Sequence, residues 1–167
     1  MPARRPFRLS LRVGAGAAAL AALAGAGLWQ SDVVLYNATP SMPVGFYLRT
    51  SGPIERGAIV TVRARDVAAR YAAERHFTDE GDRFLKRVAG AAGEEVCAAG
   101  AAVTLNGEQV AERQARDSAG RQLPTWEGCV TLGAGEVFLL GDAPDSFDGR
   151  YWGPTPVERI EGVWRRL

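Results

Sequence analysis

The stretch RFLKRVAG, residues 83–90, carries the single lysine of a 167-residue chain that otherwise uses nineteen arginines for its positive charge. A buried lysine can lose its proton near neutral pH, whereas an arginine cannot. If this stretch is a strand, Lys86 shares a face with Phe84 and Val88, and Arg87 points the other way. The stretch therefore predicts a strand that points a potential base inward among apolar side chains. The alternative is that an arginine-rich composition leaves one lysine at this position by chance.

Short runs of β-branched and aromatic residues, bounded by glycine, proline and asparagine, recur on both sides of this stretch. Such runs are typical of strands, so we expect a mainly β domain. The turn Asn106-Gly107 is predicted to join two of the strands as a hairpin. The expected strands cover residues 33–36, 45–48, 58–62, 84–88, 95–98, 102–105, 129–132, 137–140 and 160–164.

One segment departs from the strand pattern. Asp66 is placed to cap a helix through residues 67–75, in which Arg70 and Glu74 have the spacing of an ion pair. Residues 111–125 are polar and contain glycine and proline, so we expect an exposed loop there. The predicted fold is thus mainly β with a short helical insertion.

The amino-terminal part has the composition of an export segment. Residues 1–12 contain four arginines and no acid, and residues 13–29 contain no charged residue. A basic flank before an apolar stretch is typical of a membrane anchor or export signal, with the basic side in the cytoplasm. We expect a cytoplasmic tail over 1–12, one transmembrane helix or uncleaved signal over 13–30, and an exported domain over 31–167. The sequence Ala24-Gly25-Ala26 leaves cleavage open as the alternative.

The charge balance limits the partners. Residues 31–167 hold sixteen basic and nineteen acidic residues, a formal net charge of −3. A nucleic-acid partner requires a basic face, and none is visible, so we expect no nucleic acid. The apolar segment makes membrane lipid the expected surroundings of the amino terminus.

Cys97 and Cys129 are the two cysteines of the chain. Exported proteins tolerate disulfides, and a bridge between these residues would close a loop of about 33 residues, contributing roughly 3–4 kcal/mol in the chain-entropy model. We expect this disulfide, and two buried free thiols are the alternative.

Elimination narrows the chemistry to serine with lysine. A Ser-His-Asp or Cys-His site needs a histidine, and His76 is the only one, at the end of the expected surface helix. His76, Cys97 and Cys129 lack the spacing of zinc ligands, and the glycine patterns of nucleotide-binding loops are absent. We therefore expect neither a metal nor a cofactor.

The candidate nucleophile is Ser41, in NATPSMPVGFY, residues 37–47, about ten residues beyond the apolar segment. Flanking prolines favour extended or turn backbone that presents a side chain at a surface. An ordinary turn serine is the alternative.

A second polar block, residues 141–154, follows the expected strand 137–140, and loops with charges of both signs often close a site. Its simpler interpretation is a solvated turn.

Taken together and in chain order, three blocks of sequence resemble the signal peptidase I family of membrane-anchored Ser-Lys proteases. They are residues 37–47, 83–90 and 141–154. Ser41-Met42-Pro43 resembles the nucleophile box, residues 56–60 the following strand, residues 84–90 the lysine box and residues 141–153 the final box. The form Ser-Met-Pro-x-Gly-x-Tyr is similar to the TraF-type peptidases of plasmid conjugation, which mature pilin precursors. Two departures concern loop geometry: Ala92-Gly93-Glu94 replaces the usual Pro-Gly-Asp, and Gly149 stands where a serine is common.

The resemblance implies a β-rich catalytic domain on the periplasmic side of the bacterial inner membrane. It implies that Ser41 attacks the scissile carbonyl, that Lys86 is the general base, and that the Ser41 N–H and the Thr39 hydroxyl form the oxyanion hole. Ser146 would hydrogen-bond the lysine amine. Three further residues are expected to form scaffold ion pairs, namely Asp142, Asp148 and Arg150.

The resemblance also implies the substrate: a pilin-like or signal-peptide-bearing precursor, laid as an extended peptide along a sheet edge. The sequence leaves open whether water or the precursor's own amine attacks the acyl-enzyme, the second route giving a cyclic pilin.

A general signal peptidase of broad range is the first alternative. A catalytically silent anchored module that binds a partner is the second. The related self-cleaving repressors would begin with a DNA-binding helical domain, which the basic and apolar opening argues against.

Overall fold

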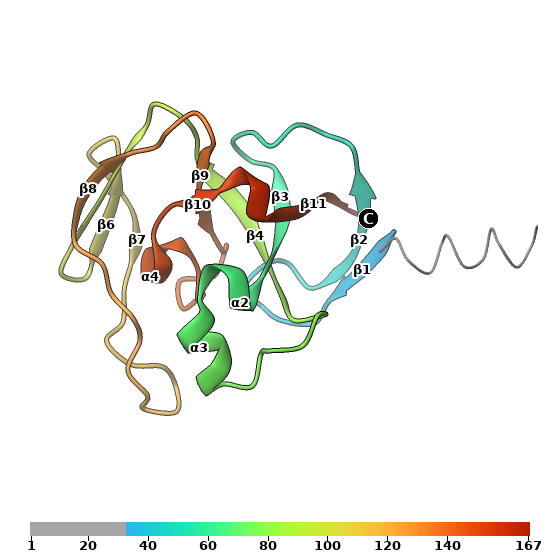
Figure 1. Cartoon of the computed structure of the whole chain (residues 1–167), viewed down its shortest axis with the longest axis horizontal. Coiled ribbons are helices and arrows are strands. Elements are labelled where there is room, and N and C mark those ends of the chain that lie inside the picture. Colours follow the sequence, from blue (N-terminus) through green and yellow to red (C-terminus); the bar gives the residue numbers. More distant parts are fainter. Residues whose placement is uncertain (1–32) are drawn as a thin grey trace, which may run out of the picture. The chain divides into compact units, whose positions relative to one another are not determined.

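The computed structural model describes residues 33–167, which form two antiparallel sheets (Figure 1). The larger sheet has the spatial order β1 (Val34–Asn37), β2 (Gly45–Thr50), β11 (Ile160–Arg166), β3 (Ile59–Arg63), β4 (Arg83–Gly90), β9 (Glu136–Leu140) and β10 (Thr155–Pro156). The smaller sheet has the order β7 (Glu108–Glu112), β6 (Ala102–Leu105), β5 (Glu95–Ala99) and β8 (Gly128–Thr131). The expected mainly β fold is confirmed, and the expected strands are present with ends shifted by one or two residues.

Strand β9 is covered on both faces, which explains its unbroken apolar run. Phe138 and Leu140 pack into a cluster with the apolar side chains of the smaller sheet. Val137 and Leu139 pack into a second cluster with side chains of β3 and β4. Because side chains alternate between the two faces of a strand, a strand buried on both faces needs apolar residues at every position. β9 therefore links the cores of the two sheets.

The helical insertion between β3 and β4 differs from the expected helix. It consists of two short helices, α2 (Ala64–Val67) and α3 (Ala69–Glu74), separated at Ala68, whose φ of −149° is not helical. The Ala64 N–H donates to a backbone carbonyl oxygen in the segment before β4, so α2 begins directly where β3 ends. Asp66 consequently lies inside α2 and caps neither helix, which corrects the prediction. The Arg70–Glu74 ion pair is present at 2.8 Å.

The Asn106-Gly107 hairpin is confirmed, with φ of 52° and 83° at its two turn residues. The strand that follows it, β7, takes the first two residues of the predicted loop 111–125. Most of the remaining loop is exposed, as expected. Arg113 is an exception, because its side chain is buried and donates to backbone carbonyl oxygens and to Glu127.

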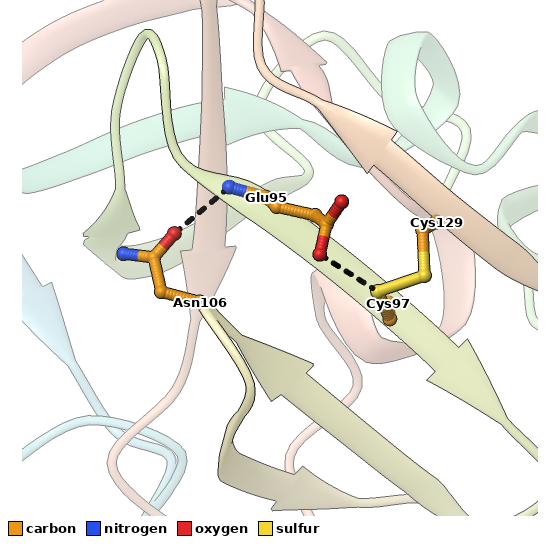
Figure 2. The surroundings of a disulfide bond; sticks show 4 residues. All are labelled: Glu95, Cys97, Asn106 and Cys129. Atoms are coloured by element: carbon orange, nitrogen blue, oxygen red, sulfur yellow. Dashed lines mark hydrogen bonds between the residues drawn. A yellow bond between two sulfur atoms is a disulfide. The ribbon is translucent and has the colours of Figure 1, made fainter.

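Cys97 on β5 and Cys129 on β8 lie opposite each other in register and form a disulfide (Figure 2). The predicted bridge is therefore present, and it ties the edge strand β8 to its neighbour. A Glu95 carboxylate oxygen lies 3.6 Å from the Cys97 sulfur. A disulfide sulfur carries no hydrogen, so this approach is a contact and not a hydrogen bond. The Glu95 N–H donates to the side-chain oxygen of Asn106 at 2.9 Å.

Within residues 33–167, no helix has the length and apolar character needed to cross a bilayer. The expected transmembrane helix, residues 13–30, and the expected cytoplasmic tail, residues 1–12, lie outside the described part of the chain.

Candidate active site

Strand β4 holds Lys86 with its side chain almost completely enclosed, at 2% exposure. Val88, two residues further along the same face, belongs to the apolar cluster between β3 and β9, and Phe84 packs against that cluster. The Lys86 amine lies 5.7 Å from the centre of the Phe84 ring. Leu85 points to the opposite face, into a cluster with Met42 and other apolar residues of the sheet. The alternation expected for this stretch is thus present.

Burial lowers the pKa of the Lys86 amine from 10.5 to about 8, because the charged form loses its hydration. The carboxylates of Asp148 and Asp142 oppose this lowering of the pKa, and the guanidinium of Arg150 adds to it. The amine donates a hydrogen bond to Ser146 Oγ at 2.9 Å inside the protein. Ser146 itself is 3% exposed, so the amine and its acceptor are both shielded from water.

Ser41 lies in the turn between β1 and β2, and the residues after it show why the motif has its particular form. Met42 is fully buried and anchors the turn in the core. The hydroxyl of the buried Tyr47 donates to the Pro43 carbonyl oxygen at 2.6 Å. Gly45 has a φ of 145°, a conformation that side chains with a Cβ rarely adopt. These contacts hold the turn so that Ser41 remains partly accessible.

Asn37 is a part of the site that the sequence analysis did not single out. Its buried side-chain amide donates to the carbonyl oxygens of Thr39, Met42 and Pro43, at 2.8, 2.9 and 3.2 Å. Its side-chain oxygen accepts from the Thr39 N–H at 3.3 Å and from the Thr39 hydroxyl at 3.0 Å. The available signal was an asparagine at the start of a proline-containing turn, where such side chains commonly bond the local backbone.

The Thr39 hydroxyl lies between Asn37 and the candidate nucleophile. Its oxygen is 3.1 Å from Ser41 Oγ, which places Thr39 beside Ser41. Among the hydrogen bonds of residues 33–167, none uses the Ser41 N–H, so that donor is available to a ligand.

The loop after β9, which begins the sequence block 141–154, contacts both Ser41 and Lys86. The N–H groups of Asp142 and Ala143 donate to the Ser41 carbonyl oxygen at 2.8 and 3.4 Å. Gly141 fills a position with no room for a side chain: an added Cβ would lie 2.1 Å from Ser146 Oγ and 2.8 Å from the Ser41 carbonyl oxygen. The loop thus positions Ser146 against Lys86 and holds the backbone at Ser41.

Two ion pairs brace this loop. Asp148 is fully buried and accepts from the Arg150 Nε at 2.8 Å, from the Arg150 N–H at 3.1 Å and from the Gly141 N–H at 2.7 Å. Arg150 also donates to the Ala143 and Pro144 carbonyl oxygens. Charged groups that are paired and fully hydrogen-bonded in this way can remain buried.

The second brace is nearer the surface, where both oxygens of Asp142 accept from Arg87 at 2.9 and 2.8 Å. Arg87 lies on the outward face of β4, beside Lys86 in sequence and opposite to it in direction. The pair therefore ties the lysine strand to the loop after β9.

Ser41 and Lys86 line one cavity of about 480 Å³, together with Thr39 and Asn37. Its walls also include residues of β1, β3, α2, α3, the segment before β4 and the start of β4, together with Phe147. Within the described part of the chain, no hydrogen bond joins Ser41 Oγ to the Lys86 amine. The two groups thus share a cavity while each contacts a different hydroxyl.

Groups typical of metal sites lie elsewhere. His76 is exposed after α3. Glu95, Cys97 and Cys129 offer ligand atoms within 4.8 Å of one another. The two sulfurs are joined in the disulfide, and a metal prefers a thiolate, so this trio does not suit a metal ion in the oxidised protein.

Comparison with known proteins identifies the family of the chain. Two plasmid transfer proteins TraF from Escherichia coli are similar to the chain: one is 37% identical over 169 residues, covering 95% of this chain and 94% of the relative. The other is 36% identical over 162 residues, covering 90% and 89%. A crystal structure of a signal peptidase I from Enterococcus faecalis V583 aligns with 68% of this chain and 98% of its own, at 23% identity and a TM-score of 0.40. Residues 9–166 match the signal peptidase family, peptidase S26, and the chain therefore belongs to that family.

Proposed function

We propose that this protein is a membrane-anchored serine endopeptidase that cleaves exported precursor proteins, with Ser41 as nucleophile and Lys86 as general base. Membership of the signal peptidase family makes a peptide chain the substrate class. The observation that carries the proposed roles is a buried lysine, with its pKa lowered to about 8, that shares one cavity with an accessible serine. At pH 7 about one molecule in eleven then has a neutral amine, against about one in 3,000 at the ordinary pKa.

The proposed reaction begins at the Ser41 hydroxyl. Ser41 Oγ attacks the scissile carbonyl carbon while its proton passes to the neutral Lys86 amine. The carbonyl oxygen takes the negative charge and is stabilised by the free Ser41 N–H and the Thr39 hydroxyl. Collapse of the intermediate breaks the C–N bond, and the Lys86 ammonium returns the proton to the leaving amine. The acyl-enzyme ester is then released by an incoming nucleophile.

The free edge of β1 supports an extended substrate. β1 is one of the two edge strands of the larger sheet, and among residues 33–167 it pairs with β2 alone. Its residues Leu35 and Tyr36 line the cavity, as do Phe84 and Leu85 of β4. A peptide added to this edge would place its scissile bond at Ser41 through backbone hydrogen bonds. Asp142, Asp148 and Arg150 act in this proposal as scaffold, through the ion pairs described above.

The substrate that we propose is a conjugative pilin precursor, because the two relatives are plasmid transfer proteins and are similar to this chain over most of its length. The proposal places the catalytic domain, residues 31–167, on the periplasmic side of the bacterial inner membrane, with residues 13–30 as the anchor. Hydrolysis and cyclisation are the two outcomes, and they differ by the nucleophile that reaches the ester.

Co-expression with candidate precursors, followed by intact-mass measurement, tests the function. We expect a pilin precursor to be shortened, and a product lighter by one water than the linear cleaved form would identify cyclisation. Cleavage of unrelated exported precursors would indicate a general signal peptidase instead. Ser41→Ala and Lys86→Arg should each abolish cleavage, whereas Ser51→Ala, at an exposed serine outside the cavity, should retain it. Full activity of Lys86→Arg would refute the base assignment, and full activity of Ser41→Ala would refute the nucleophile.

A further inference from the structure

The amide of Asn37 has a settled orientation. Its nitrogen faces three carbonyl oxygens, which can only accept, so the nitrogen and oxygen cannot be exchanged without setting acceptor against acceptor. Its oxygen is therefore the atom that faces the Thr39 hydroxyl at 3.0 Å, and this oxygen can only accept. The single proton of the Thr39 hydroxyl consequently points at Asn37.

This orientation decides the direction of the next hydrogen bond. The Thr39 and Ser41 hydroxyl oxygens are 3.1 Å apart, and either could donate on distance alone. Because the Thr39 hydroxyl donates its one proton to Asn37, the donor between Thr39 and Ser41 must be the Ser41 hydroxyl. A directed chain thus runs from the Ser41 hydroxyl to Thr39 and on to Asn37.

The hydrogen bond of the Lys86 amine also points away from Ser41. The Lys86 amine donates to Ser146 at 2.9 Å, and within residues 33–167 no hydrogen bond connects it to Ser41. In the free protein, the proton of the candidate nucleophile therefore faces away from its candidate base.

We propose that Asn37 is a positioning residue, and that the chain Asn37–Thr39–Ser41 holds the Ser41 proton away from Lys86 until a substrate carbonyl arrives. This proposal rests on the proposed peptidase function. A substrate carbonyl oxygen at the Ser41 N–H competes with Asn37 for the Thr39 proton. Once Thr39 turns to that oxygen, the Ser41 hydroxyl is released to donate to Lys86. The same movement completes the oxyanion hole and engages the dyad, so the nucleophile is activated only when the cavity is occupied.

A titration of the free protein tests the resting arrangement without any substrate. The chain has one lysine, so full-length protein labelled with ¹³C at the lysine ε-carbon gives a single NMR signal that reports Lys86. We expect Ser146→Ala to lower the Lys86 pKa further, by about half a unit or more, because the charged amine loses its acceptor. Ser41→Ala should change it by less than about 0.2 unit. A change with Ser41→Ala as large as that with Ser146→Ala would overturn the proposal.

A double-mutant cycle tests whether Asn37 acts through Thr39. Asn37→Ala should lower kcat for precursor cleavage by about 30- to 100-fold, with KM changed less than about threefold, because loss of a correctly placed Thr39 hydroxyl from the oxyanion hole outweighs release of the Ser41 proton. In a Thr39→Val background, the same substitution should cost at least about tenfold less, because the hydroxyl that Asn37 orients is already gone. Thr39→Ser keeps the hydroxyl and should restore the full effect of Asn37→Ala. An equal loss in both backgrounds would mean that Asn37 only supports the turn, and would overturn the positioning role.

The two proposals fail in different ways. Absence of precursor cleavage by the native protein removes the peptidase function, and full activity of Ser41→Ala or Lys86→Arg removes the assigned nucleophile or base. Inactivity of both variants together with equal losses in the cycle removes only the role of Asn37. Should Asn37→Ala fail to fold, as thermal melting would show, the lysine titration still decides the direction of the Ser41 proton, since Ser41→Ala alters a partly accessible hydroxyl.

Discussion

Replacing Lys86 by methionine should stabilise the protein, although it removes the proposed base. The Lys86 side chain is buried and its pKa lies at about 8 instead of 10.5. A difference of about 2.5 in pKa corresponds to about 3 kcal/mol against the charged amine at pH 7. Methionine has a similar volume and no charge, so it avoids this cost. Loss of the hydrogen bond to Ser146 costs about 1 kcal/mol, so the free energy of unfolding should rise by a net of about 2 kcal/mol.

The gain must depend on pH in a defined direction. Between pH 8 and pH 10.5, the unfolded chain binds a proton at this lysine that the folded chain does not, so the stability of the native protein rises with pH in this window. Below pH 8 the cost of the charged amine is fully present, and above pH 10.5 it is absent. The advantage of Lys86→Met over the native protein should therefore be largest near pH 6–7 and shrink by about 3 kcal/mol by pH 11.

Urea unfolding of the full chain in detergent, followed by tryptophan fluorescence, measures this difference at pH 6.5, 9 and 10.5. Arg165→Met is the matched control, because it removes an exposed positive charge from β11 and should show no comparable pH dependence. A Lys86→Met variant that is destabilised by the same amount at every pH would refute the account of a lysine that burial drives toward neutrality.

Three further predictions concern the same site and its scaffold. The rate of precursor cleavage should rise with pH and reach half its maximum near pH 8, where Lys86 loses its proton; a rate that stays flat from pH 6 to 9 would contradict its role as base. Gly141→Ala should reduce cleavage at least about 100-fold, because the new Cβ displaces the lysine's hydroxyl partner and the nucleophile turn, whereas Gly135→Ala, with open space around it, should remain active. The disulfide between Cys97 and Cys129 should make unreduced protein migrate faster than reduced protein on denaturing gels, and its removal should lower stability by roughly 3–4 kcal/mol; identical mobility would argue against the bridge.

Local sequence was sufficient for the features that depend on neighbours along the chain. The strand alternation at RFLKRVAG determined that Lys86 points inward and Arg87 outward, and the Asn106-Gly107 turn determined a hairpin, because both depend on backbone geometry over a few residues. The helical insertion was only partly predictable. Its start is set by a hydrogen bond to the segment before β4, and this contact overrides the capping preference of Asp66.

Tertiary structure decided how Ser41 and Lys86 are held. Ser146 reaches Lys86 across sixty residues of sequence because β4 pairs with β9, and the loop that follows β9 then lies over the lysine. The same loop donates two N–H groups to the Ser41 carbonyl oxygen. The free energy of burying an amine, and the direction in which a hydroxyl proton points, depend on groups that only strand pairing brings together. Sequence alone therefore named the nucleophile and the base as candidates, and the folded chain determined their partners.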